Sequence, residues 1–112
     1  ILGGAAMGDI GMHFPDSDPA YKGADSLHLL EIVMERVRAA GYEVCNVDAT
    51  ILAQAPKLSP HKQQMRENLA RAAGLDVDQV SVKATTEEGL GFTGSGEGMA
   101  VHAVALLEKK AE

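Results

Sequence analysis

The sequence is poor in aromatic side chains and contains no tryptophan. Of its 112 residues only 4% are aromatic, two Phe and two Tyr, whereas 46% are hydrophobic. A core must therefore be built from Ala, Val, Leu, Ile and Met, whose small side chains allow backbones to pack closely. The length suits one modest core, so we interpret residues 1–112 as a single domain.

Disulfides, basic patches and long apolar runs are also missing. The single cysteine, Cys45, excludes an internal disulfide and favours a reducing compartment. A formal net charge of −6 provides no basic stripe for nucleic acid or for an anionic membrane surface. No apolar run is long enough to span a bilayer. We therefore predict neither nucleic acid nor membrane as a partner. A phosphorylated substrate would need local cations or metals to offset the negative charge.

Three helical segments are predicted. Residues 1–7 are interpreted as the last turns of an apolar helix that Gly8 ends, and because the chain does not begin with Met we expect a segment before it. A second helix runs over 26–40, with Ser26 as its N-cap and Gly41 after its end. In this helix Glu31, Glu35, Arg36 and Arg38 are expected to face water.

The third helix starts at Ser59-Pro60 and ends at Gly74. Strict alternation over 44–54 predicts a half-buried strand, with Cys45 and Val47 on its apolar face. A short strand is predicted over 80–85, whereas the apolar run 99–107 suits either a helix or a strand. This alternation predicts an α+β fold, in two layers, with a sheet packed against helices.

Several polar positions are candidates for chemistry. Asp9, Asp16 and Asp18 share one segment and suit metal or hydroxyl binding, although aspartates are also common in turns. The four histidines form no close pair typical of a zinc site, and Cys45 is interpreted as a buried, inert thiol.

Two segments that follow strands are candidate ligand loops. The segment Gln54 to Lys57 suits recognition of a base edge or an ordinary turn. The run Ala84 to Glu88 places two hydroxyls beside carboxylates, which suits a phosphate with its divalent cation or a solvated polar loop. The Gly-rich stretch 91–98 matches neither a dinucleotide motif nor a phosphate-binding P-loop.

Several short strings follow one another along the chain: Gly8-Asp9-Ile10-Gly11, Phe14-Pro15-Asp16, Asp18-Pro19, Lys22 to Ser26, Asn46-Val47-Asp48, Ala53 to Lys57, Val82 to Thr86 and Leu90 to Gly94. Taken in this order, the strings resemble the C-terminal portion of the 2-C-methyl-D-erythritol 2,4-cyclodiphosphate synthase family. They cover essentially the whole chain. The resemblance implies a phosphorus–oxygen lyase of the non-mevalonate isoprenoid pathway. The 2-phosphate of 4-diphosphocytidyl-2-C-methyl-D-erythritol 2-phosphate attacks the β-phosphorus, and CMP leaves.

The resemblance also implies roles for individual residues. The cytosine would be held by Ala53, Gln54, Ala55, Pro56, Lys57 and Leu58, with Ala84, Thr85 and Thr86 completing the nucleotide pocket. The methylerythritol pocket would be lined by Asp9, Ile10, Gly11, Phe14 and Asp16. Thr86 and Asp9 are the expected catalytic residues, and Glu88 is the expected ligand of a divalent cation, Mg²⁺ or Mn²⁺.

Further expectations concern the assembly and the zinc ion. The resemblance implies a mixed sheet in a ferredoxin-like arrangement, with 99–107 as a strand, and a homotrimer whose sites lie between subunits. It implies a cytoplasmic or plastid enzyme. The family's zinc ligands lie in an N-terminal segment that these residues lack, so the chain alone is expected to be inactive. Ser95 stands where the family often has an Arg. That Arg faces the central cavity of the trimer and can bind anionic isoprenoid ligands, so Ser95 removes a cation that such ligands would contact.

Two alternatives remain open at this point. The chain suits a non-catalytic, trimeric module that binds cytidine nucleotides through the same two loops. It also suits an unrelated α/β regulatory domain with coincidental matches.

Overall fold

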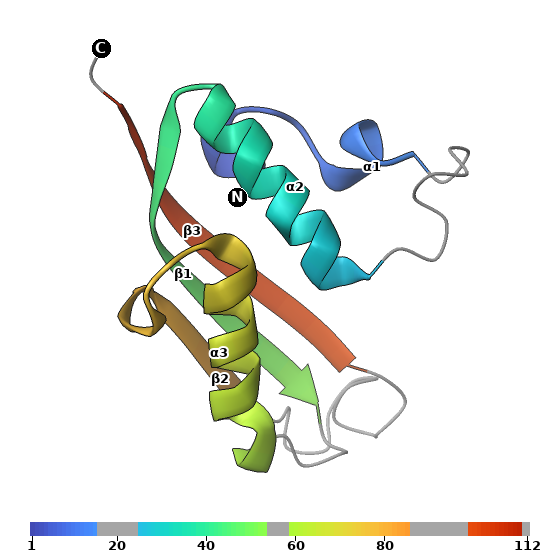
Figure 1. Ribbon diagram of the computed structural model, residues 1–112. Coiled ribbons are helices and arrows are strands. Elements are labelled where there is room, and N and C mark those ends of the chain that lie inside the picture. The colour runs from blue at the N-terminus through green and yellow to red at the C-terminus, as the bar shows by residue number, and fades with distance from the viewer. Residues whose placement is uncertain (16–24, 54–58, 86–98, 111–112) are drawn as a thin grey trace.

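The computed structural model describes residues 1–15, 25–53, 59–85 and 99–110 (Figure 1). Along the chain the elements are η1 (Gly3–Ala5), α1 (Ile10–His13), α2 (Ser26–Ala39), β1 (Tyr42–Ala53), η3 (Ser59–His61), α3 (Lys62–Ala73), η4 (Val77–Gln79), β2 (Val80–Thr85) and β3 (Met99–Lys109). The predicted mixed α+β fold is confirmed. The apolar run 99–107, whose residues suit either a helix or a strand, lies in strand β3, as the resemblance implied. No helix in these ranges is long and apolar enough to cross a membrane.

The described strands form a mixed sheet in the order β2-β1-β3. β1 pairs in parallel with β2 and antiparallel with β3. α3 connects β1 to the neighbouring strand β2, so these three elements are a simple parallel crossover unit. The expectation of a ferredoxin-like arrangement is therefore wrong for these strands, because that arrangement splits the crossover unit with an intervening strand.

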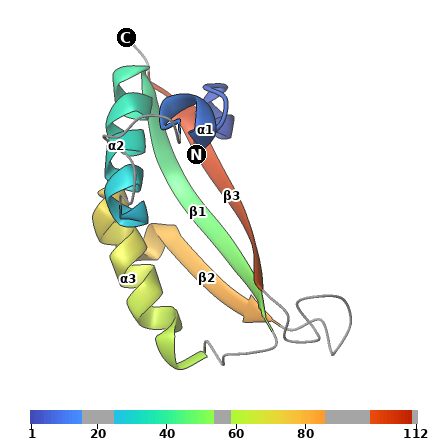
Figure 2. The same ribbon diagram turned by 90° about the vertical axis from the view of Figure 1, so that its right-hand side faces the viewer.

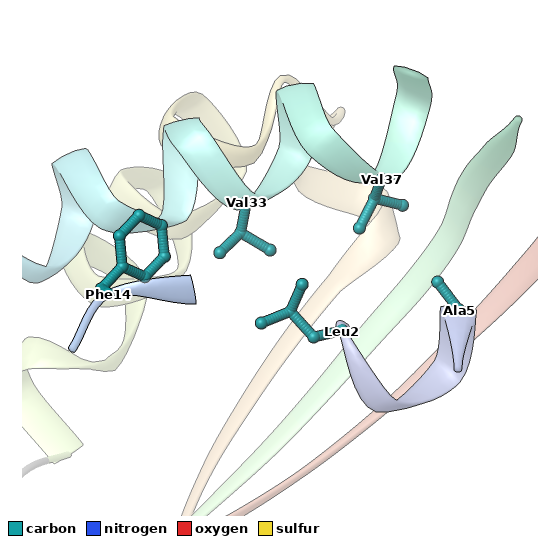
Figure 3. Packing of buried hydrophobic residues seen from close by; sticks show 5 residues of the cluster. All are labelled: Leu2, Ala5, Phe14, Val33 and Val37. Atoms are coloured by element: carbon teal, nitrogen blue, oxygen red, sulfur yellow. The ribbon is translucent and has the colours of Figure 1, made fainter. Parts of the chain in front are cut away.

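The molecule has two layers, with α2 and α3 on the same face of the sheet (Figure 2). One group of buried side chains lies between the N-terminal residues and α2, and comprises Leu2, Ala5, Phe14, Val33 and Val37 (Figure 3). A second group, Met34, Val44 and Ala73, joins α2 to β1 and α3. Val37 and Val44 are almost fully buried, so the middle of α2 is fixed against the sheet.

The face of the sheet opposite α2 and α3 is uncovered within the described part of the chain. Val104 of β3 pairs with Asp48 of β1, and Leu106 pairs with Asn46, so these four residues share that face. The side chains of Val104 and Leu106 are 73% and 63% exposed. We call Asn46, Asp48, Val104 and Leu106 the open face.

The helix boundaries agree with the sequence at their C-terminal ends and differ at their N-terminal ends. Gly41 and Gly74 follow α2 and α3 with φ of 94° and 67°, a conformation that favours glycine. Asp25, not Ser26, caps α2, and its Oδ1 accepts a hydrogen bond from the amide of Leu27. Residues 1–7, expected to be the end of an α-helix, contain only the three-residue 3₁₀ turn η1.

Cys45 does not lie on the apolar face with Val47. The register of β1 against β3 shifts between Val44 and Asn46, so Cys45 is an extra residue in β1. This irregularity turns its side chain towards Glu108, with Sγ 3.9 Å from Oε2. The thiol is half-buried, so the prediction of a buried cysteine is wrong.

Candidate active site

Two strand ends that precede the predicted nucleotide loops lie side by side. Leu52 of β1 is in register with Thr85 of β2, and Ala53 is in register with Met99 at the start of β3 (Figure 1). The chain therefore leaves β1 and β2, and enters β3, at one end of the sheet. In open sheets with parallel strands, ligands commonly bind beyond the carboxyl ends of those strands.

Part of the predicted nucleotide pocket is described directly. Ala84 is half-buried and Thr85 is exposed at the end of β2. The remaining predicted residues Gln54, Ala55, Pro56, Lys57, Leu58, Thr86, Glu88 and Asp16 lie outside the described residues. The structure thus brings the two strand ends together, as required if both loops contact one nucleotide.

The predicted methylerythritol residues cluster on and beside α1. Asp9 caps this single turn, and its Oδ1 accepts a hydrogen bond of 3.0 Å from the amide of Met12. Because one oxygen holds the turn, the other carboxylate oxygen, which has no hydrogen bond to the described residues, is available to a ligand hydroxyl. Asp9, Ile10 and Gly11 are exposed, whereas Phe14 is buried in the core. Phe14 therefore anchors this region and does not line an open pocket within the single chain.

An apolar groove of about 550 Å³ lies between the helices and the sheet. Asp9 and Ile10 lie at its wall together with Ile51 and Val101, which flank the candidate end of the sheet. Its polar lining is small because most of its wall consists of aliphatic side chains from α2, α3 and the strands.

α1 and the ends of β1 and β2 border the same groove but lie apart in one chain (Figure 1). Among the described residues, no hydrogen bond or ion pair joins Asp9, Ile10 or Gly11 to Ala84 or Thr85. A second hollow, of about 440 Å³, lies along β2 and α3, and no predicted site residue lines it. The predicted site residues therefore form two groups in one chain, which we call the α1 half-site and the strand-end half-site.

Arg36 and His13 are contacts of α1 that the sequence did not reveal. Arg36 was expected to face water, but it is half-buried and its Nη1 lies 3.0 Å from His13 Nδ1. Arg36 follows Val33 by three residues and Ile32 by four, which places it at the border of the buried stripe of α2. That spacing is the one sequence feature that favours a partly buried Arg36. Arg38 is also half-buried, against Glu43 and the carbonyl of Ala73.

Among the described residues, Glu43 has a pKa that differs from its ordinary value, and it lies away from both half-sites. The Lys110 ammonium, with a smaller contribution from the Arg38 guanidinium, lowers the pKa of Glu43 below its ordinary value. This ion-paired group joins α2, β1 and the end of β3. Its location indicates a role in stability and not in catalysis.

The described residues do not fit a metal ion. Within residues 1–15, 25–53, 59–85 and 99–110 no three His, Cys, Asp or Glu side chains lie close enough to hold one. Glu88, the expected ligand of a divalent cation, lies outside these ranges.

Comparison with known proteins shows the family. The model of the YgbB family matches residues 1–108. The chain belongs to the YgbB family. A curated relative, the 2-C-methyl-D-erythritol 2,4-cyclodiphosphate synthase of Trichlorobacter lovleyi, is 66% identical over 107 residues, which are 96% of this chain and 68% of that protein.

Solved structures agree with this YgbB assignment. The bifunctional IspDF from Campylobacter jejuni has a TM-score of 0.89 and 44% identity, covering 99% of this chain and 30% of that one. IspF of Plasmodium falciparum, in a complex with CDP, has a TM-score of 0.83 and 30% identity, covering 98% of this chain and 65% of that one. The expected family is thus confirmed. The alternative, an unrelated α/β regulatory domain with coincidental matches, is wrong.

Proposed function

We propose that this YgbB chain carries the nucleotide and methylerythritol half-sites of a 2-C-methyl-D-erythritol 2,4-cyclodiphosphate synthase. The observation that carries the proposal is the 66% identity to a relative of that name over 96% of this chain. The reaction joins the 2-phosphate of the substrate to its β-phosphorus. The bond from the β-phosphorus to the bridging oxygen of CMP breaks, and that electron pair leaves with CMP.

The protein's contribution to this reaction is to position one molecule. The attacking and leaving groups belong to the same substrate, so no covalent nucleophile is needed, and holding the two phosphates in line lowers the barrier. Residues 53–58 with Ala84, Thr85 and Thr86 hold the cytidine end and its phosphates. Asp9 accepts a hydrogen bond from a hydroxyl of methylerythritol through the carboxylate oxygen that α1 does not use. The bound CDP of the Plasmodium falciparum relative supports the nucleotide half of this proposal.

The complete site is proposed to lie between two subunits of a homotrimer. The separation of α1 from the strand ends supports this, because one chain supplies both half-sites at different places. The open face supports association too, since Val104 and Leu106 are large and exposed. Asp48 lies on that face with a buried Oδ1 that has no hydrogen-bond partner within the described part. Light scattering should give three chain masses. Val104→Glu should give a smaller assembly, whereas the control Gln63→Glu on α3 should not.

A divalent cation held by Glu88 is proposed from the resemblance alone. Elemental analysis of the purified protein, before and after dialysis against chelator, measures its zinc and magnesium content. Glu88→Gln should weaken Mg²⁺ binding in calorimetry, and unchanged binding would remove Glu88 from the proposal.

The test of function is the product mixture. The protein is incubated with the diphosphocytidyl substrate, and CMP and the cyclic diphosphate are measured by ³¹P NMR. Equal amounts of both support the synthase. Binding of CDP without turnover, the result expected where the zinc ligands are absent, supports the second candidate, a non-catalytic module that binds cytidine nucleotides, which the adjacent strand ends also favour. If the protein shows no turnover and does not bind CDP, both candidate functions are contradicted.

A further inference from the structure

The α1 half-site consists of one short helical turn that has little stability of its own. α1 has four residues, and an isolated helix of one turn is unstable in water. Ile10 and Met12 are 54% and 72% exposed, so the turn is not held by burial of its own side chains. The cap by Asp9 fixes the shape of the turn but not its place on the protein. Contacts on either side of the turn must therefore hold it in place.

His13 joins the two ends of this segment to α2. Its Nε2 lies 2.9 Å from the carbonyl oxygen of Met7, which precedes Gly8 and Asp9. Its Nδ1 lies 3.0 Å from Nη1 of Arg36, and the same Nη1 lies 3.3 Å from the carbonyl oxygen of His13. One imidazole thus closes residues 7–13 into a loop and connects that loop to α2.

These contacts require one form of the imidazole. A carbonyl only accepts, so Nε2 carries the proton and donates to Met7. A guanidinium only donates, so Nδ1 of His13 is the acceptor for Arg36. The neutral Nε2–H tautomer satisfies both contacts, whereas the Nδ1–H tautomer and the imidazolium place two donors against each other.

Arg36 adds a third contact on the far side of the turn. Its guanidinium carbon lies 4.7 Å from the centroid of the Phe14 ring, within the range of a cation–π interaction. Phe14 packs with Val33 and Leu2 in the core (Figure 3). Arg36 has no ion pair with a described acidic side chain, whereas Arg38 on the same helix binds Glu43. Arg36 is therefore engaged by the segment that carries Asp9 and not by the general surface charge.

We propose that His13 and Arg36 are positioning residues, which hold Asp9 and Ile10 where they contact the methylerythritol part of the substrate. The inference rests on the proposed function. It assigns no role to His13 or Arg36 at the nucleotide half-site, because the contacts that define them all lie within residues 7–14 and α2. Loss of either side chain should therefore weaken binding of the methylerythritol part and leave binding of the nucleotide unchanged.

Two ligands separate the half-sites. CDP carries no methylerythritol, and 2-C-methyl-D-erythritol 2,4-cyclodiphosphate carries no cytidine. In calorimetry, His13→Ala and Arg36→Met should each bind the cyclic diphosphate about tenfold more weakly and bind CDP within about twofold of the wild type. His13→Gln, whose amide offers one acceptor and one donor, should recover part of the loss.

Two control variants separate positioning from general destabilisation. His28→Ala removes an exposed histidine of α2 that pairs with Glu31. Arg38→Ala removes the bond from α2 to the carbonyl of Ala73 and should lower Tm. Both should keep their affinity for the cyclic diphosphate. Equal loss of both ligands in His13→Ala, or loss of neither, overturns the inference. Wild-type protein that binds neither ligand shows instead that the proposed function is wrong, and the inference falls with it.

A spectroscopic measurement tests the contact without a ligand. Long-range ¹H–¹⁵N correlation at neutral pH should show Nε2 of His13 protonated and Nδ1 unprotonated. Arg36→Met should shift Nδ1 and bring the ring towards the averaged pattern of an imidazole without a fixed partner. An averaged pattern in the wild type would overturn the assignment.

Discussion

Phe14 provides the most demanding test of the structure, because one side chain serves both the core and the candidate site. Its side chain is 6% exposed and packs with Leu2, Val33 and Val37. Replacing a buried phenylalanine by alanine costs about 3–5 kcal/mol, and the cation–π contact with Arg36 adds about 0.5–1 kcal/mol. A domain of this size has a total stability of about 5–15 kcal/mol, so Phe14→Ala should lose a large share of its stability.

Urea unfolding followed by far-UV circular dichroism measures this loss. Phe14→Leu, which keeps most of the volume, should cost about 1–1.5 kcal/mol and lower Tm by several degrees, roughly 4–8 °C for each kcal/mol. Met12→Ala is the matched control, since Met12 is 72% exposed and should cost less than about 0.5 kcal/mol. A cost below about 1 kcal/mol for Phe14→Ala, or a cost no larger than that of Met12→Ala, would refute the packing described here.

Three further predictions concern helix ends and charge. Asp25→Ala should lower the free energy of unfolding by about 1 kcal/mol and Ser26→Ala by much less, and urea titrations giving the reverse order would contradict Asp25 as the cap. Gly74→Ala should cost about 1 kcal/mol in the same assay because its φ is +67°, and a stabilised variant would be inconsistent with this backbone. Glu43→Gln removes a carboxylate whose pKa is lowered mainly by Lys110. The small stability difference should be complete above the ordinary glutamate pKa and should vanish as the pH falls through the lowered pKa, whereas a difference that persists in acid would rule out the ion pair as its cause.

The sequence predicted the elements well where a local rule decides them. Gly41 and Gly74 mark the ends of α2 and α3 because only glycine adopts their positive φ readily. The strand Val80–Thr85 has the bounds that its alternation indicates. The family resemblance resolved the apolar run at β3, which periodicity could not, because a buried strand and a buried helix share the same residue types.

Non-local features could not be predicted in the same way. The side to which Cys45 points depends on an irregular pairing with β3, some 60 residues further along the chain. The place of Arg36 depends on His13 and Phe14, which precede it by more than twenty residues. The cap by Asp25 was missed because Asp and Ser are both favoured N-cap residues and the pattern does not choose between neighbours.

For the candidate site, the sequence and the resemblance named residues, and the structure describes the positions of some of them. The sequence indicated two ligand loops after strands, and the structure shows that their strand ends are neighbours, with Leu52 in register with Thr85. The exposed position of Asp9 agrees with a binding role, whereas Phe14 proved to be a buried anchor. The exposure of Asp9 and the burial of Phe14 do not follow from the sequence pattern alone. Both depend on how residues 1–14 pack against α2, which is a tertiary contact.

A nucleotide site at the ends of β1 and β2 is tested most directly by titrating the ¹⁵N-labelled protein with CDP and following its amide chemical shifts. We expect saturable shifts at Ala84 and Thr85 and at Leu52 and Ala53, with little change along α1. No shifts, or shifts confined to the hollow between β2 and α3, would contradict a nucleotide site at the ends of β1 and β2.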